Sequence, residues 1–585
     1  MNPESESNIV NNMHRSYDSG LWDEVVELSQ HIESNSSNFL ESCQLAAIAE
    51  YQLGNLDKAI QCLGEVINTE HNNANLFLNY ANFMALANKP EEAVTYFNKS
   101  LKLNPTSAAA HNNLGSVFFD LKKFDYSLNC FLSAIKFKPN YWEAFSSIGN
   151  VYFQQQQYQQ ALENYQKAFD LHPKDLGLLN NFALALMQTG SLDRAAELFQ
   201  KALKMSPQDA NLFIPLSAIL NTLGAHSDAE KVLNAGIEST PWYFSNTQSD
   251  LKKLTEVLSF SGLESSLYDL DENNQVKLNG GHFYSKYLIE EAKFRRCKYH
   301  ILNKNIESEK HLPEIKLFIN TISDPDLEKQ SLISLSKYLS IKNDIAIINH
   351  PDQVLLTSRD NNYQRFKNIK GLRFPKTIRI FIEQPKSLIK TIMDAFEFPL
   401  LIRKSGTQTG TSFVKIKDQE ELLKIISSLK GFEIYVIEYI DTHFSDENKN
   451  TLFRRFRFFF IDNIMYPVTC HIHQSWNVHS IDRSSVMQQQ EDLKTIEEDF
   501  LNGPKNIIGN ENYNALSKLP EIVGLDFFGV DFSVTQDNQL VLFEVNAAMN
   551  HTYNYVDKFP YLKRHLEEIT YAFHRLIEKR HNSLK

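Results

Sequence analysis

The feature that most constrains the fold is a proline that recurs every 34 residues along the first part of the chain. The positions are Pro105, Pro139, Pro173, Pro207 and Pro241. Proline ends a helix, because its ring removes a backbone donor and collides with the preceding turn. A fixed period of this length indicates short helical units that cannot bury their apolar faces alone and therefore stack. The sequence thus predicts an all-α array of repeated helix pairs.

Small and apolar residues return at the same places in each period. In residues 108–140, Gly115 marks a first helix and Phe131 marks a second, and Gly149 takes the place of Gly115 one period later. The small residues are needed where helices cross closely. The pattern resembles the tetratricopeptide repeat, a helix–turn–helix unit that stacks into a superhelix. The resemblance implies an α-solenoid over residues 1–245.

Asparagine recurs at the sixth and ninth positions of these repeats. In tetratricopeptide repeats those positions line the concave surface, and the asparagines resemble the ladders with which some such arrays clamp an extended peptide. An amide side chain both donates and accepts hydrogen bonds, so it matches a peptide backbone. The alternative is a plain scaffold, since asparagine is common throughout the chain. The residues expected to bind a protein or peptide partner are Asn79, Asn82, Asn113, Asn150 and Asn181.

Length and composition narrow the class of protein. A chain of 585 residues exceeds one ordinary core, so several domains are expected. The net charge of −12 argues against a nucleic-acid partner. Five scattered cysteines without a CxxC pair favour a reducing compartment. No run of 18 apolar residues and no cleavable signal is visible, so we expect no membrane span and a cytoplasmic location.

The pattern changes after Pro241. We interpret residues 246–311 as a connecting segment that is helical in part. From residue 312 onward, strand-like runs alternate with helical ones, without the regular βαβ period of a doubly wound sheet. This indicates a mixed α+β region, with a first subdomain over residues 312–370 and a larger one over residues 371–585.

A hairpin near the C-terminus carries an acid in the middle of each strand. In GVDFSVTQDNQLVLFEVN, a two-residue turn at Asp537-Asn538 places Asp531 directly opposite Glu544. Carboxylates about 4.5–5.5 Å apart repel each other. A bound Mg²⁺ or Mn²⁺ would turn that repulsion into attraction, whereas the alternative is a solvated polar face. The opposite, buried face is predicted to hold Val530, Phe532, Val534, Val541, Phe543 and Val545.

Residues 312–575 resemble an ATP-grasp domain. The resemblance rests on four motifs in order: the entry segment IINHPDQVLLTSRDNNYQRFKNIKGLRFPKT, the strand and loop FPLLIRKSGTQTGTSFVKI, the hinge strand YVIEYI, and the hairpin. It implies ATP and Mg²⁺ (or Mn²⁺) as cofactors. By this resemblance the phosphates are bound by Arg403, Lys404, Gly406, Thr407, Gly410, Thr411 and Ser412. Adenine is framed by Val436, Ile437 and Glu438, and the metal is held by Asp531, Glu544 and Asn546.

The chain departs from the family pattern at two cationic positions. Arg403 aligns where the superfamily has a lysine, and Lys404 follows it. Adjacent strand residues face opposite ways, so the sequence leaves open which of the two points inward. Upstream, Asn361 replaces a second lysine, and Arg359 or Arg365 stands in. The loop after the hairpin lacks the common Pro-Gly, so the substrate of better-known members cannot be carried over.

Two further residues are candidates for catalysis. Arg457 resembles the arginine that many ATP-grasp members direct at the phosphate or intermediate. His473 shares a strand face with His471 and could act as a general base or substrate contact, since histidine titrates near neutrality. The alternative for both histidines is an ordinary polar place on a strand.

The implied activity is that of an ADP-forming ligase. ATP would phosphorylate a small-molecule or peptide carboxylate, and an amine or thiol would attack the acyl phosphate. The repeat array would recruit a protein or peptide partner. Two alternatives remain open: a kinase built on the same fold, and a nucleotide-binding adaptor without catalysis.

Overall fold

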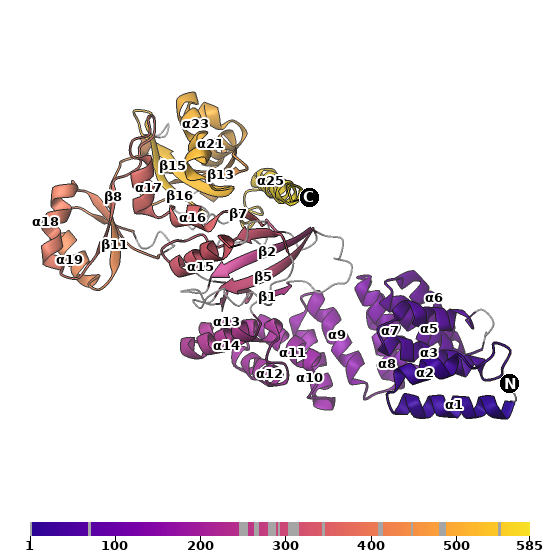
Figure 1. Cartoon of the computed structure of the whole chain (residues 1–585). Helices are drawn as coiled ribbons and strands as arrows, with labels where there is room; N and C mark the ends of the chain where they lie inside the picture. Colours follow the sequence, from indigo (N-terminus) through magenta and orange to yellow (C-terminus); the bar gives the residue numbers. More distant parts are fainter. Residues whose placement is uncertain are drawn as a thin grey trace. The chain divides into compact units, whose positions relative to one another are not determined.

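The computed structural model describes thirteen stretches of the chain: 3–67, 72–240, 242–244, 255–262, 268–278, 288–289, 293–301, 315–341, 345–407, 413–445, 449–478, 487–547 and 551–584. It forms two compact units (Figure 1). The first comprises Met1–Pro207 with Glu272–Gln275, and the second comprises Gln208–Asp271 with Val276–Lys585.

Antiparallel helix pairs build the first unit, which confirms the predicted all-α array. The two helices of each pair pack on each other, and successive pairs of this unit meet through the second helix of one pair and the first helix of the next. Seen in Figure 1, the pairs follow one another in sequence order. The helices are α1 (Pro3–Asp18), α2 (Trp22–Ser29), α3 (Phe39–Gln52), α4 (Leu56–Gly64), α5 (Ala74–Leu86), α6 (Pro90–Leu103), α7 (Ala108–Asp120), α8 (Phe124–Phe137), α9 (Trp142–Gln154), α10 (Tyr158–Leu171), α11 (Leu176–Gln188) and α12 (Leu192–Met205).

A seventh helix pair belongs to the second unit. Helices α13 (Ala210–Thr222) and α14 (His226–Ser239) continue the repeat pattern, but by their contacts they group with the second unit, which begins at Gln208. The physical reason lies in α13, which is buried at almost every position from Ala210 to Ile219. A helix that is apolar all round needs partners on both sides. One of them is strand β3 (Tyr268–Leu270) of the second unit.

Glycines of the first helices allow the close crossing in two of these pairs, α7–α8 and α9–α10. A Cβ atom at Gly115 would lie 2.7 Å from the ring of Phe131, and one at Gly149 would lie 2.5 Å from the ring of Tyr165. Real Cβ atoms are not found that close to a ring carbon, so any larger residue forces the helices apart. The repeat pattern in the sequence therefore records a packing requirement.

A five-stranded sheet opens the second unit, and it corrects the prediction for residues 246–311. The order is β1-β5-β2-β6-β7, with β1 antiparallel and the other pairs parallel. Part of the expected connecting segment therefore forms central strands. The elements are β1 (Trp242–Phe244), β2 (Thr255–Gly262), β5 (Phe294–Ile301), β6 (Leu317–Asn320), α15 (Lys329–Leu339) and β7 (Ala346–Ile348), with the separate hairpin of β3 and β4 (Val276–Leu278).

The sequence did not predict these strands, because they contain many polar and charged residues. Strand β5 reads FRRCKYHI, which looks like a solvated charged run. In the fold Arg296 is buried, and its Nε donates to the hydroxyl of Ser259 on β2 at 2.9 Å. His300 lies 3.2 Å from the hydroxyl of Tyr268. Buried polar groups are tolerated when they are hydrogen-bonded, and only the tertiary structure supplies such partners.

A four-stranded sheet, β10-β9-β11-β8, forms the middle of the second unit. One face packs on helices α18 and α19 through an aliphatic cluster that includes Ile402, Ile434 and Val436. The opposite face carries Arg403 and Tyr435, because strand neighbours alternate. The elements are α16 (Pro351–Leu355), α17 (Arg359–Phe366), β8 (Thr377–Phe381), α18 (Pro385–Ala395), β9 (Leu400–Lys404), β10 (Phe413–Ile416), α19 (Gln419–Ser428) and β11 (Glu433–Glu438).

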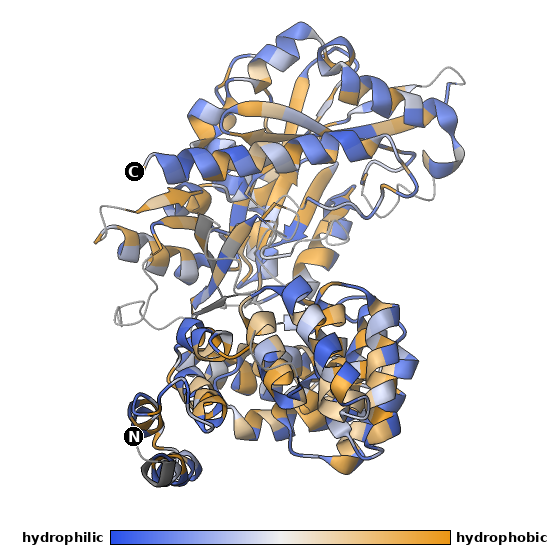
Figure 2. Ribbon diagram, turned by 90° about the vertical axis from the view of Figure 1, so that its right-hand side faces the viewer, coloured by the Kyte–Doolittle hydropathy of each residue, from blue (hydrophilic) through white to orange (hydrophobic). Residues whose placement is uncertain are grey.

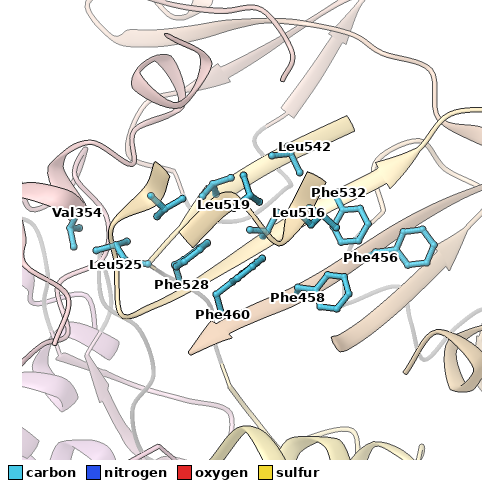
Figure 3. Packing of buried hydrophobic residues seen from close by; sticks show 14 of the residues in the cluster. Val354, Phe456, Phe458, Phe460, Leu516, Leu519, Leu525, Phe528, Phe532 and Leu542 are labelled. Carbon is cyan, nitrogen blue, oxygen red and sulfur yellow. The ribbon is translucent and has the colours of Figure 1, made fainter. Parts of the chain in front are cut away.

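A third sheet carries the predicted hairpin, in the order β12-β13-β15-β16 with β14 beside β13. Stacked phenylalanines cross its strands (Figure 3): Phe460 lies over Phe528 at 4.5 Å between ring centroids. Helices α21 to α24 cover this apolar face, and α25 packs on β7, β13 and β14. The elements are β12 (His443–Ser445), β13 (Thr451–Ile461), β14 (Ile464–His473), α21 (Glu491–Asn502), α22 (Pro504–Ile508), α23 (Asn510–Leu516), α24 (Leu519–Val523), β15 (Phe527–Val534), β16 (Leu540–Asn546) and α25 (Leu562–Asn582).

Hydropathy follows this layering. In Figure 2 the strands of the second unit are largely apolar, while the helices around them present many polar residues. None of the helices in the described residues has the length and apolar character needed to cross a bilayer.

The hairpin confirms the opposition of Asp531 and Glu544 but not the turn from which it was predicted. The turn spans Thr535 to Gln539, which is longer than the expected two residues. A β-bulge after Asp531 then shifts the register back by one residue. The same bulge exchanges the two faces of β16 between Leu540 and Phe543, so the predicted set of core-facing residues was wrong in that part of the strand. Leu540 and Leu542 join the main apolar cluster with Val530, Phe532, Val534 and Val545, and Val541 and Phe543 do not.

The glycine–ring contacts can be tested by adding one methyl group. Gly149→Ala should lower the free energy of unfolding by about 1–3 kcal/mol, because the new Cβ collides with Tyr165. Gly64→Ala in α4 is the matched control, since no heavy atom lies within 4 Å of its Cβ position. The control should be neutral, or stabilising by up to about 1 kcal/mol. Denaturant unfolding followed by circular dichroism measures both, and equal effects would contradict the packing argument.

Candidate functional site

A cleft lies between the middle sheet and the third sheet, inside the second unit. The middle sheet contributes Leu401, Phe413 and Ile437, and the third sheet contributes Asp531 and Glu544. The cleft encloses about 840 Å³, part of it open to solvent.

The carboxylate of Asp531 lies at the floor of the cleft and is paired with arginine. Arg457 donates to its two oxygens at 2.6 and 2.8 Å, and Arg455 approaches one of them at 3.6 Å. Only 2 % of the Asp531 side chain is exposed. A buried charge needs such partners, because its desolvation is otherwise not compensated. The strands supply them, since Arg457 on β13 is the register partner of Asp531.

Glu544 is the more accessible of the two carboxylates. Its side chain is 30 % exposed, and one oxygen accepts from Arg359 at 3.0 Å and from the amide of Asn546 at 2.7 Å. Arg359 also donates to the backbone carbonyl of Phe543 at 3.1 Å. The pair is therefore held by arginines from two other elements, α17 and β13.

Arginine charge keeps both carboxylates ionised. Burial alone would raise the pKa of Asp531, but Arg457 and Arg455 outweigh it and lower that pKa below its ordinary value. Burial likewise opposes ionisation of Glu544, and Arg359 with Arg403 lowers the pKa of that carboxyl overall. The repulsion expected between the two acids is thus already offset by protein side chains.

Arg403 and Lys404 both line a smaller pocket beside the cleft, which shares Arg359 and Glu544 with it, but their charged groups point different ways. Arg403 is buried, its Nε donates to the hydroxyl of Thr407 at 3.3 Å, and its guanidinium lies 4.9 Å from the ring centre of Phe413. Burial, followed by the nearby charge of Arg359, lowers its pKa to about 10. The ammonium of Lys404 instead lies over Phe432, 3.5 Å from the ring centre. The charged groups of Arg403 and Lys404 therefore diverge, because strand neighbours point to opposite faces.

Arg359 and Arg365, the two candidates to replace the upstream lysine, have different contacts. Arg359 reaches the carboxylate pair, as described above. Arg365 bonds the backbone carbonyls of Ile522 and Val523, so its role is to tie α17 to α24. Arg359 is thus the residue that enters the candidate site.

Of the three residues expected to frame adenine, two line the cleft and one does not. Ile437 and Glu438 line the cleft, whereas Val436 points into the aliphatic cluster beneath the sheet. The carboxylate of Glu438 bonds Arg373 at 2.6 Å and the backbone N–H of Lys376 at 2.9 Å. Val436 is therefore excluded from the cleft by strand alternation.

The remaining predicted residues lie near the cleft or outside the described part. Gly406 and Thr407 line a smaller pocket that shares Arg359 and Glu544 with the cleft. Gly410, Thr411 and Ser412 lie outside the described residues. Arg455, rather than the predicted Arg457, lines the cleft, because Arg457 is fully engaged with Asp531. His473 ends β14, where its Nδ1 accepts from the backbone N–H of Ser475 at 2.8 Å.

Sequence analysis missed three contributors to the site. Phe543 was assigned to the core, yet the bulge turns it into the cleft. Trp476 also lines the cleft; it lies between His473 and His479, and the sequence pattern pointed to the histidines rather than to its ring. Arg379 bonds Asp326 at 2.6 Å and Asp360 at 3.1 Å, and so ties the middle sheet to helix α17 and to the turn that precedes α15. The sequence did not indicate these ion pairs of Arg379, since the two aspartates lie far from it and from each other along the chain.

The predicted metal ligands can be compared with what a cation requires. Asp531, Glu544 and Asn546 are oxygen-bearing and adjacent on the paired strands, which suits a hard ion such as Mg²⁺. Each carboxylate oxygen has two lone-pair sites, so Asp531 can hold Arg457 and still offer an oxygen. In the part of the chain that the structure describes, no three His, Cys, Asp or Glu side chains gather to hold a metal. The donor set therefore fits Mg²⁺ and gives no indication of a zinc-type site.

The asparagines of the first unit form hydrogen-bonded pairs. Asn113 donates to Asn82 at 2.9 Å, and Asn181 donates to Asn150 at 3.0 Å, each pair joining successive first helices. Tyr165 also donates to Asn150 at 2.7 Å. All four amides are half-buried, as is Asn79 on α5. An amide has four hydrogen-bonding sites, so each paired asparagine keeps capacity for a further partner.

Comparison with known proteins identifies the repeats. Two models described as tetratricopeptide repeat match residues 147–210 and 186–241, and one described as TPR repeat matches residues 115–156. Residues 115–241 therefore consist of tetratricopeptide repeats, as predicted, and such repeats serve protein–protein interaction. No curated protein matches the chain.

Several solved structures are similar over about a third of the chain. YrrB, described as a TPR protein with an unusual peptide-binding site, is 23 % identical, with 31 % of this chain and 92 % of that chain covered and a TM-score of 0.27. MamA is 25 % identical, with 28 % and 94 % covered and a TM-score of 0.25. PilF of Pseudomonas aeruginosa is 18 % identical, with 34 % and 90 % covered and a TM-score of 0.32.

The buried pairing of Asp531 predicts how stability depends on pH. Because its folded pKa is lowered, the pair stabilises the fold above the ordinary carboxyl pKa near 3.8, and this contribution is lost as pH falls. Asp531→Asn should therefore cost about 3–5 kcal/mol at pH 7, and its gap from the wild type should narrow below about pH 4. Urea unfolding at several pH values measures the gap.

Asp537→Asn is the matched control, since Asp537 is exposed at the hairpin turn. Its stability should follow the wild type at every pH. A gap for Asp531→Asn that does not change with pH would rule out an ionised, arginine-paired carboxylate.

Proposed function

We propose that the second unit binds ATP with Mg²⁺ in the cleft and uses it to join a carboxylate to an amine or thiol, while the repeat array recruits a protein or peptide partner. One observation carries this proposal. A single cleft combines an apolar slot with a cluster of arginines, and an adjacent carboxylate pair lies among those arginines.

The order of residues along the strands supports a nucleotide as the ligand. On the middle sheet Arg403 and Tyr435 form one cross-strand row, and Leu401 and Ile437 form the next row two residues along. Two residues of a strand span about 6.6 Å. A ligand with an anionic part over the first row and a flat apolar part over the second would match this face. A nucleoside triphosphate has that construction.

Charge supports the same ligand. Four guanidinium groups, those of Arg359, Arg403, Arg455 and Arg457, act on the two carboxylates. Guanidinium groups beside a carboxylate pair complement a triphosphate that carries one divalent cation. Arginine suits this role because its planar fork binds phosphate through two parallel hydrogen bonds.

The chain's own residues have distinct parts in the proposed reaction. Glu544 and Asn546, with Asp531, would hold Mg²⁺, which supplies charge neutralisation on the phosphates. Arg457 keeps Asp531 ionised and in place. Arg455 and Arg359 line the cleft beside the carboxylates, where they would orient an anionic substrate and stabilise charge that develops during transfer.

The partner role is proposed for the first unit. Its paired asparagines present a row of half-buried amides on successive first helices. Amides recognise a peptide backbone without selecting its side chains. A protein or peptide partner in extended conformation would fit this row, and the carboxylate or the amine could belong to that partner.

Product analysis tests the reaction class. The full chain is incubated with MgATP and a cell extract, ADP release is followed, and proteins and metabolites are searched for mass shifts. We expect ADP release that depends on an amine or thiol and a product whose mass equals the joined substrates less water. Glu544→Gln should abolish it.

Other products would contradict the ligase. A gain of one phosphate mass on a target would indicate a kinase, and saturable ATP binding without turnover would indicate an adaptor. Full activity of Glu544→Gln would remove the metal assignment.

Two adjacent cations provide a matched test of nucleotide binding. Arg403→Ala should weaken MgATP binding by about 10- to 100-fold, as expected for lost hydrogen bonds to a charged group. Lys404→Ala should stay within about twofold of the wild type, because its ammonium lies on the other face of β9. Isothermal titration calorimetry measures both constants. Equal losses of affinity in the two variants would mean that MgATP responds to the overall positive charge of this strand and not to the side on which each cation lies.

A further inference from the structure

The first helices of the repeats carry acids and no basic side chain of the Lys or Arg type. Helices α5, α7, α9 and α11 together contain Asp120 and Glu143 and neither Lys nor Arg. The positive side chains of these helix pairs lie on the second helices α6, α8, α10 and α12, at Lys99, Lys102, Lys136, Lys167, Arg194, Lys201 and Lys204. Charge is therefore segregated between the two kinds of helix, and the helices that bear the asparagine pairs offer only negative charge.

Two oxygen atoms on neighbouring first helices are buried without a hydrogen-bond donor. Among the described residues, neither the side-chain carbonyl oxygen of Asn112 on α7 nor the Oε2 atom of Glu143 on α9 has a partner. Asn112 is only 9 % exposed, and its amide nitrogen donates to Asn113 at 3.3 Å. Asn180 repeats this arrangement two periods later, since its amide nitrogen donates to Asn181 at 3.4 Å and its carbonyl oxygen has no partner. An unmet buried acceptor is costly, so these oxygens indicate where a donor from another molecule would bind.

The repeat geometry brings Asn112 and Glu143 together. The two hydrogen-bonded asparagine pairs described above each join residues 31 apart on successive first helices. Asn112 and Glu143 have the same separation, and their helices α7 and α9 are in contact. Ser116 and Ser147 take the places of such a pair on α7 and α9, and Asn112 and Glu143 each come one helical turn earlier. Residues four apart share a helix face, so the two unmet oxygens lie next to each other on the face of the asparagine row.

We propose that Asn112 and Glu143 form a subsite for the charged group of a Lys or Arg side chain, so that the partner of the repeat array is a basic segment in extended conformation. The inference rests on the proposed recruitment of a peptide partner, and it adds one position at which a side chain is selected. An ammonium or guanidinium group donates to both oxygens at once. It also balances the carboxylate of Glu143, which has no ion-pair partner within the described part of the chain.

Charge and ligand number argue against other occupants of this subsite. Acidic residues outnumber Lys and Arg by 22 to 14 in residues 1–207, so an anionic segment is repelled. A neutral amide supplies donors but leaves the charge of Glu143 unpaired. Two side chains are too few for Ca²⁺ or Mg²⁺, which take about six or more oxygen ligands. A cationic side chain meets both requirements.

Three labelled peptides test the charge preference on the full chain. Each has about twelve residues, which in extended form cross four helices about 10 Å apart. Serine alternates with lysine in the first peptide, with glutamine in the second and with glutamate in the third. Fluorescence anisotropy measures binding at an ionic strength near 0.15 M, where exposed charges are screened beyond about 8 Å. The lysine peptide should bind at least about tenfold more tightly than the glutamine peptide, and the glutamate peptide should bind most weakly.

Variants of Glu143 locate the preference. Glu143→Gln should weaken binding of the lysine peptide by about 10- to 100-fold, as expected for a lost hydrogen bond between charged groups. Glu163→Gln is the matched control, because it removes the same charge from an exposed position on the second helix α10. It should stay within about twofold of the wild type. Glu143→Lys should reverse the order of the lysine and glutamate peptides, a result that an unfolded variant could not give.

The outcomes distinguish this inference from the proposed function. Equal affinity of the wild type for the lysine and glutamine peptides would overturn the cation subsite and leave recruitment of a peptide by the asparagine row standing. Equal losses in Glu143→Gln and Glu163→Gln would also overturn it, because binding would then depend on net charge alone. If the wild type binds none of the three peptides, the proposed peptide recruitment fails together with the subsite.

Discussion

The second unit depends on one buried charge cluster, in which Asp531 is held between Arg457 and Arg455 at the floor of the cleft. Two carboxylates on adjacent strands would repel each other without these arginines. Breaking such a buried pair is costly because it leaves an unpaired charge. The cluster thus fixes the third sheet and, at the same time, creates the positive field that makes the cleft a candidate anion site. Stability and proposed function share the same residues.

Strand alternation decides how the rest of the site is assembled. The same rule directs the guanidinium of Arg403 toward Phe413 and the ammonium of Lys404 onto Phe432, and it directs Ile437 into the cleft and Val436 into the core. A motif match names a short run of residues, but only half of any strand faces one side. The candidate nucleotide contacts therefore form a subset of the motif residues, joined by groups from other elements.

The hairpin illustrates how a correct prediction arose from compensating differences. The actual turn is longer than two residues, and the bulge restores the opposition of Asp531 and Glu544. The predicted core face was right for β15 and wrong for part of β16, where Phe543 turns to the cleft. A bulge depends on the neighbouring strand and side chains, so the pattern of one hairpin does not specify it.

The sequence by itself determined the repeat array, because a 34-residue period with a small residue at each helix crossing has few other packed solutions. It also placed the two acids on neighbouring strands of one hairpin, although their direct opposition depends on the bulge. Only the tertiary structure decided which cations reach those acids, and that FRRCKYHI is a buried strand. The physical reason is the distance along the chain over which each interaction acts. Periodicity is local in the chain, whereas a buried charge is satisfied by partners such as Arg359 and Glu544, which the sequence separates and the fold brings together.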